Sequence, residues 1–292
     1  MAQVLTANRL RDGDVVYWRA GRWVEPLSEA TIFPDSAAAK RVLARIDVMQ
    51  GDADAAIAAA RDVMAADPKK SSFELVEILV ALDRREEARQ ELERVRAAGG
   101  VAVEVDQRLA ILAFDSGDLV EAQRRFTDLA AHGEVGEGVV LYLADIAARD
   151  GDTQAALSGY RQLENSQLAL TARTRAAGIL IATDRTAAFT LLDDYAVAHP
   201  EQTFQLTITK AHLLADHGES DAAVALIQAS LERHPHHPTL EYELSVLLER
   251  AGDVHESVAT LERMLSERPE DSNLQNALGY TLADHDLELP RA

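Results

Sequence analysis

The sequence contains no cysteine, which excludes disulfides, thiol chemistry and metal sites built from thiolates. Basic residues are also scarce, because 29 Lys and Arg stand against 49 Asp and Glu, giving a formal net charge of −20. Such a negative field repels nucleic acid and anionic membranes over most of the surface. The composition therefore favours a basic or neutral protein partner and argues against nucleic-acid binding.

Long apolar runs are missing as well. No stretch approaches the roughly 18 apolar residues of a membrane helix, and Met1 to Arg11 lack the apolar core of a signal peptide. We therefore expect no direct membrane insertion. The chain as written is expected to be cytoplasmic, or to be exported or membrane-anchored if an upstream signal is missing.

Motifs that carry chemistry are absent too. The sequence has no Gly-x-Ser-x-Gly and no phosphate-binding Gly-rich loop followed by Lys, so we expect no enzyme, no catalytic residue and no cofactor. Three of the nine histidines, His234, His236 and His237, crowd one Pro-interrupted loop. Side chains of such a loop point into water and do not converge, so we expect no metal site there.

A regular internal period is the strongest positive signal. Short turns recur every 32 to 34 residues, at Gly51-Asp52, Asp83-Arg84, Gly117-Asp118, Gly151-Asp152, Asp184-Arg185, Gly218-Glu219, Gly252-Asp253 and Asp284-His285. Small residues precede these turns at Ala44, Ala110, Ala144, Ala177, Ala211, Ser245 and Gly279, with the bulkier Val76 in the second unit. A further series follows the turns at Ala56, Ala88, Ala122, Ala156, Ala188, Ala223 and Ser257. Apolar residues between them follow helical spacing, so each unit is predicted to be a helix, a tight turn and a second helix packed closely on the first.

These registered series resemble the tetratricopeptide repeat, most closely at residues 204–237 and 238–271. The resemblance implies an all-α, right-handed superhelical solenoid of antiparallel helix pairs. The resemblance covers roughly residues 37–284, and the solenoid domain is predicted over residues 37–292, with seven helix pairs and a partial eighth. The segment from Gln275 to Asp284 is also similar to a larger bacterial family of multi-repeat proteins.

Residues 1–36 do not follow the helical period. Alternating apolar residues and the turns Asp12-Gly13 and Ala20-Gly21 predict a short β-meander, which we expect to cap the first helix pair. An alternative makes Trp18, Trp23, Arg19 and Arg22 a separate ligand patch or enzymatic module. The segment resembles a small bacterial family of unknown function found beside sulfite reductase genes.

The resemblance also implies which side chains face the groove, since the first helix of each tetratricopeptide unit lines the concave wall. The implied partner-binding residues are Arg108, Tyr142, Asp145, Arg149, His212, Tyr242, Glu243, Arg250, Asn276 and Tyr280, beside Gln107, Ile111, Leu141, Ile208 and Val246. We expect an adaptor or scaffold that binds a peptide or helix of a partner in this acidic groove. The alternative is a self-associating subunit that forms a homo-oligomer through residues 272–292, where the last unit is uncapped.

Overall fold

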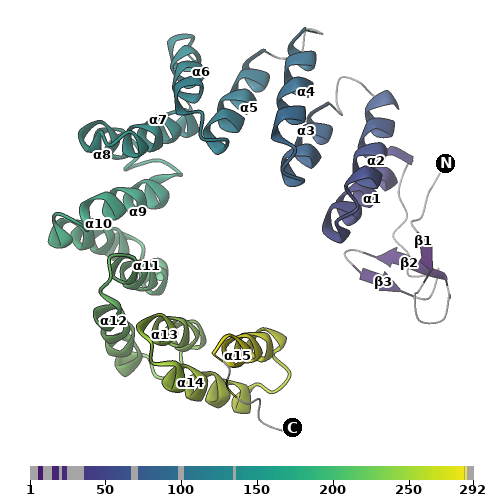
Figure 1. The fold of residues 1–292 in the computed structure, drawn as a ribbon. Helices are drawn as coiled ribbons and strands as arrows, with labels where there is room; N and C mark the ends of the chain where they lie inside the picture. Colours follow the sequence, from purple (N-terminus) through teal and green to yellow (C-terminus); the bar gives the residue numbers. More distant parts are fainter. Residues whose placement is uncertain are drawn as a thin grey trace. The chain divides into compact units, whose positions relative to one another are not determined.

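The computed structural model describes residues 6–8, 15–19, 22–24, 36–66, 72–97, 102–133, 136–285 and 287. The chain divides into two compact units, Met1–Val135 and Gly136–Ala292. Figure 1 labels the helices and strands of both units.

The described residues of the first unit contain three helix pairs. They are α1 (Ser36–Gln50) with α2 (Ala53–Ala66), α3 (Ser72–Ala81) with α4 (Arg85–Ala97), and α5 (Ala102–Asp115) with α6 (Leu119–Ala131). Three short strands precede them, namely β1 (Thr6–Asn8), β2 (Val15–Arg19) and β3 (Arg22–Val24).

The strands pair antiparallel in the order β1-β2-β3, with Thr6 opposite Tyr17 and Trp18 opposite Trp23. This backbone pairing does not establish the predicted β-meander as a folded domain. Its side chains, including those of the Trp18 and Trp23 patch, lie outside the described part of the chain. The cap and the domain boundary at residue 36 therefore stay predictions.

In the second unit, residues 136–285 form four pairs of α-helices and one further α-helix. The pairs are α7 (Glu137–Arg149) with α8 (Thr153–Gln162), α9 (Ala169–Leu180) with α10 (Arg185–Ala198), α11 (Thr203–Asp216) with α12 (Ser220–Arg233), and α13 (Pro238–Ala251) with α14 (Val254–Glu267). The short 3₁₀ helix η2 (Pro200–Gln202) precedes α11, and α15 (Ser272–Asp284) follows α14. The predicted all-helical architecture of repeated pairs is confirmed for the helical part of the chain (Figure 1).

The recurring Gly-Asp turns have a local physical cause. Gly151 adopts a φ of 82°, a left-handed conformation that glycine reaches without steric cost, and the amide of Asp152 donates to the Ala147 carbonyl at 2.8 Å, closing α7. The Asp152 carboxylate then accepts the Ala155 amide at 2.9 Å and caps α8. One dipeptide therefore ends one helix and starts the next.

Apart from Gly279 of the last helix, the small residues of the two series lie buried between paired helices. Ala110 and Ala122 have no exposed surface, and the same holds for Ala211 and Ala223. The helices α7 and α8 approach closely, since a Cβ on Gly159 would lie 2.7 Å from the Ala144 Cβ. Small side chains thus set the helix spacing, and leucine, isoleucine and phenylalanine fill the space beside them.

Candidate functional site

A cavity of about 790 Å³ is lined by α13, α14 and α15 in the second unit. One wall carries Tyr242 and Val246 of α13, and the other carries Asn276 and Tyr280 of α15. Leu261 and Met264 of α14 also line it, and because both are almost fully buried they form its apolar base. The cavity therefore has aromatic and polar walls above an apolar floor.

The position of each residue around its helix decides whether its side chain faces the core or the cavity. Pro238 opens α13 behind the N-cap His237, and Leu240, Leu247 and Leu248 turn into the core. At 3.6 residues per turn, Tyr242 and Val246 then lie on the opposite side of the helix. In α15 the Asp271 carboxylate accepts the amides of Asn273 and Leu274, at 3.1 and 3.3 Å, and fixes the first turn.

The two tyrosines are the most prominent feature of the walls. Tyr242 is 38% exposed and Tyr280 is 70% exposed. A tyrosine offers a large apolar face together with a hydroxyl, so an exposed pair beside an apolar cavity is suited to anchoring another chain. Four of the predicted groove residues are thus brought together here, namely Tyr242, Val246, Asn276 and Tyr280.

Other predicted groove residues link successive first helices. His212 Nε2 lies 2.9 Å from the Glu243 carboxylate, and Arg250 donates to Asp216 at 2.9 Å. These contacts join residues 31 and 34 positions apart in the sequence, which is one repeat. His212, Glu243 and Arg250 therefore take part in contacts that join α11 to α13.

Asp145 departs from the prediction because it is buried, with 7% of its surface exposed. Its carboxylate accepts the Tyr160 hydroxyl at 2.7 Å and forms an ion pair with Arg175 of α9. Burying a carboxylate costs free energy unless it is paired and hydrogen-bonded, and these two partners meet that requirement. Burial also raises the pKa of Tyr160 to about 12, which keeps its hydroxyl a donor. Asp145 therefore joins α7 to α8 and α9 through buried contacts and does not face an open groove.

Two apolar residues placed in the groove from the sequence are buried instead. Leu141 packs in the core around α7 to α9, and Ile208 packs in the core around α11 to α13. Packing against neighbouring helices removes this apolar surface from water, which outweighs facing an open groove. Sequence position alone misassigned both side chains.

The remaining predicted residues lie elsewhere. Tyr142 and Arg149 belong to α7 and do not line the cavity between α13 and α15. Arg108 belongs to the first unit, where its guanidinium lies 4.4 Å from the centre of the Phe73 ring and 3.5 Å from Glu77. The predicted residues are therefore distributed over both units, and only some of them line the cavity beside α13 and α15.

The first unit has its own cavity of about 360 Å³ beside two first helices. Arg41 and Met49 of α1 line it together with Glu74 and Ile78 of α3, and Arg41 donates to Glu74 at 2.5 Å. An opening beside neighbouring first helices thus recurs in the array.

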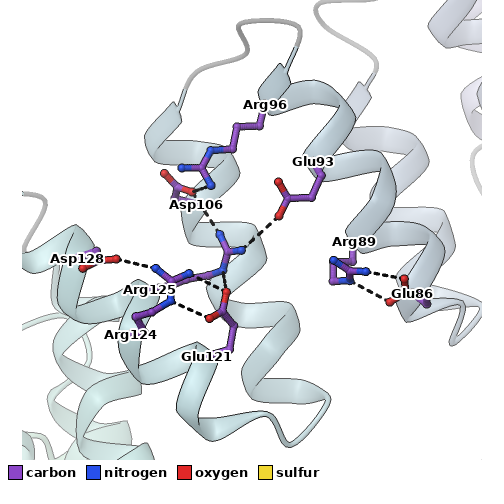
Figure 2. A network of polar contacts seen from close by, with 9 residues as sticks. All are labelled: Glu86, Arg89, Glu93, Arg96, Asp106, Glu121, Arg124, Arg125 and Asp128. Carbon is purple, nitrogen blue, oxygen red and sulfur yellow. Dashed lines mark hydrogen bonds and ion pairs between the residues drawn. The ribbon is translucent and has the colours of Figure 1, made fainter.

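The same unit contains a network of ion pairs around Arg125 that the sequence did not predict. Arg125 of α6 lies 2.7 Å from Glu121, 3.3 Å from Glu93 of α4 and 3.5 Å from Asp106 of α5, and Figure 2 shows its guanidinium among these carboxylates. Hydrogen bonds from Arg124 and then Arg125 lower the pKa of Glu121 to about 2. The network joins α4, α5 and α6. It has no sequence signature, since the partners of Arg125 are ordinary charges that lie 19 and 32 positions away or within its own helix.

None of the described helices is long and apolar enough to cross a membrane.

Comparison with known families identifies two regions of the sequence. Residues 108–169 and 208–273 match the tetratricopeptide repeat. Residues 3–100 match a family described as a protein of unknown function, DUF2849. The second match includes the N-terminal strands together with α1 to α4.

Two curated relatives are much longer than this chain. A TPR repeat-containing protein of Pseudomonas aeruginosa is 30% identical over 143 residues, which is 49% of this chain and 24% of that protein. The cellulose synthase 1 operon protein C of Komagataeibacter xylinus is 26% identical over 243 residues, which is 81% of this chain and 16% of that protein. The chain thus spans about a quarter and about a sixth of their lengths.

A solved structure shares the fold. The crystal structure of a tetratricopeptide repeat protein from Parabacteroides merdae aligns with a TM-score of 0.51 over 85% of this chain and 99% of that one, at 13% identity. The turns, the buried small residues and the family matches lead to one conclusion: the chain carries tetratricopeptide repeats, preceded by a region related to DUF2849.

Proposed function

We propose that this chain is an interaction scaffold or adaptor that binds a helix or an extended segment of a partner protein in the cavity lined by α13, α14 and α15. Tetratricopeptide-repeat proteins generally mediate protein–protein interactions. The observation that carries the proposal here is the pair of exposed tyrosines, Tyr242 and Tyr280, on walls above the apolar base of Leu261 and Met264.

Charge supports a basic or neutral partner. The net charge of −20 speeds the encounter with a basic chain, and Glu249 and Asp271 lie in the lining of the cavity. Arg268 at the same rim and the amides of Asn273 and Asn276 supply donors for backbone carbonyls of a bound segment. Binding to such a surface is expected to weaken as ionic strength rises.

Alanine variants of the two tyrosines test this proposal. A partner recovered with the full chain is retested by fluorescence anisotropy against Tyr242→Ala, Tyr280→Ala and the control Val197→Ala, whose side chain is exposed on α10 away from the cavity. Truncation of an aromatic anchor costs about 2 kcal/mol, or about thirtyfold in Kd. Equal affinity of all three variants would refute this binding site.

Self-association through α15 is the second candidate, and one observation favours it. The small residues before the turns are buried from Ala44 to Ser245, whereas a Cβ added to Gly279 meets nothing within 4 Å. The open position beside Tyr280 suits close approach of another helix, including α15 of a second copy. Light scattering after size exclusion tests this: the full chain should be an oligomer that Gly279→Arg, or truncation after Arg268, converts to a monomer. A monomeric full chain would remove this candidate.

A further inference from the structure

Three side chains that can bind a metal ion converge at the edge of the cavity. Glu249 comes from α13, Asp284 ends α15, and His285 caps that helix. One ligand atom from each lies within 4.8 Å of the other two. His285 Nε2 is 3.1 Å from Glu249 Oε1 and 4.0 Å from Asp284 Oδ2.

The distances between these ligand atoms are compatible with coordination of one metal ion by all three side chains. Zinc binds imidazole nitrogen and carboxylate oxygen at about 2.0 to 2.2 Å, so two ligand atoms of a tetrahedral site lie about 3.4 Å apart. The distances of 3.1 and 4.0 Å fall on either side of that value. The Asp284 side chain can rotate to shorten the longer distance, because it is 57% exposed.

Charge favours a divalent cation at this point. Glu249 and Asp284 place two carboxylates close together, and two acidic side chains at one point attract a cation. The adjacent Arg250 is directed toward Asp216 of α11 at 2.9 Å. A bound dication would relieve the repulsion between the two carboxylates.

A fourth residue orients the group. The Thr281 hydroxyl donates to Glu249 Oε2 at 3.2 Å, so the other oxygen, Oε1, faces His285. Thr281 is buried, with 3% of its surface exposed, so its hydroxyl is held in place. Hydrogen bonds of this kind fix the direction of a metal-binding carboxylate.

We propose that Glu249, Asp284 and His285 form a binding site for a divalent transition-metal ion, with Zn²⁺ as the best fit. Imidazole favours zinc over magnesium or calcium, which take six or more oxygen ligands. Three protein ligands leave a position open to water or to a partner group. The ion would join α13 to α15, the two walls of the cavity, and this inference does not depend on what the cavity binds.

Isothermal titration of ZnCl₂ into the full chain at neutral pH, in a buffer that does not chelate zinc, tests the site. We expect one Zn²⁺ per chain, no comparable heat with MgCl₂, and a higher Tm with zinc. His285→Gln, Glu249→Gln and Asp284→Asn should each weaken zinc binding at least about tenfold, and Thr281→Val, which leaves all three ligands, by about tenfold.

The matched control is His236→Gln, because His236 lies in the histidine-rich loop that could collect zinc adventitiously. This variant should bind as the unchanged chain does. Unchanged zinc affinity in both His285→Gln and Asp284→Asn, or loss of binding in His236→Gln, would overturn the proposal and leave an adventitious ion only. Asp284→Asn is the variant least expected to disturb the fold, because the Asp284 side chain is the most exposed of the three ligands. Circular dichroism of each variant checks that the helical fold is kept.

Discussion

Replacing Gly159 by alanine tests whether small residues set the spacing of the helix pairs. A Cβ at this position of α8 would lie 2.7 Å from the Cβ and 3.4 Å from the Cα of Ala144 in α7. Carbon atoms normally approach no closer than about 3.5 Å, and neither atom of Ala144 can rotate away. The two helices must therefore separate.

The expected magnitude is a balance of two terms. Alanine is favoured over glycine in a helix by about 1 kcal/mol, whereas overpacking a close contact costs about 1 to 3 kcal/mol. We therefore expect Gly159→Ala to lower the free energy of unfolding by up to about 2 kcal/mol. Two other helical glycines are matched controls, because a Cβ on Gly178 first meets Leu213 at 3.8 Å and one on Gly279 meets nothing within 4 Å. Gly178→Ala and Gly279→Ala should each raise the free energy of unfolding by about 0.5 to 1 kcal/mol.

Urea unfolding followed by circular dichroism measures all three variants. The double variant Ala144→Gly/Gly159→Ala removes the clash and should recover part of the loss, which gives the coupling between the two positions directly. An increase in the unfolding midpoint for Gly159→Ala equal to that for Gly279→Ala would refute the close-approach reasoning.

Three further predictions follow from single contacts. Asp152→Ala removes the cap of α8 and should cost about 1 kcal/mol in urea unfolding, whereas Asp152→Ser should keep most of the stability. Asp145→Ala removes the acceptor of the buried Tyr160 hydroxyl and the partner of Arg175, so its Tm should fall, and by more than that of Tyr160→Phe, which leaves the ion pair in place. The Glu121 pKa is about 2, below its usual 4.5, so the carboxylate stabilises the fold above about pH 4.5, and this contribution is lost as the pH falls from about 4.5 to about 2. Unfolding midpoints of Glu121→Gln should show a smaller drop over that range than those of the unchanged chain, and identical pH profiles would contradict the contribution assigned to Arg124 and Arg125.

Turns and helix pairs could be predicted from the sequence because their causes are local. Gly151 adopts the left-handed conformation that ends one helix, and the next residue, Asp152, caps the following helix. The alanines at the crossings repeat at the same interval, so their burial also follows from position in the repeat. Tyr242, Asn276 and Tyr280 were placed in a groove for the same reason.

The predictions that failed depend on side chains distant in the sequence. Asp145 is buried because Tyr160 and Arg175 meet it, and no spacing rule indicates that meeting. Leu141 and Ile208 were assigned to the groove by register, but their packing depends on the volume left by neighbouring helices. Glu249 and His285 are 36 positions apart and become neighbours only when successive first helices align.

Site-specific photo-crosslinking in the cell of origin tests the central claim most directly. A benzoyl-phenylalanine replaces Tyr280 in one chain and Val197 in a control chain, since both side chains are exposed and only Tyr280 lines the cavity. The scaffold proposal predicts a discrete adduct with another protein at position 280 that is absent at position 197. Adducts only with a second copy of this chain would favour self-association, and equal labelling at both positions, or none at 280, would contradict a binding surface between α13 and α15.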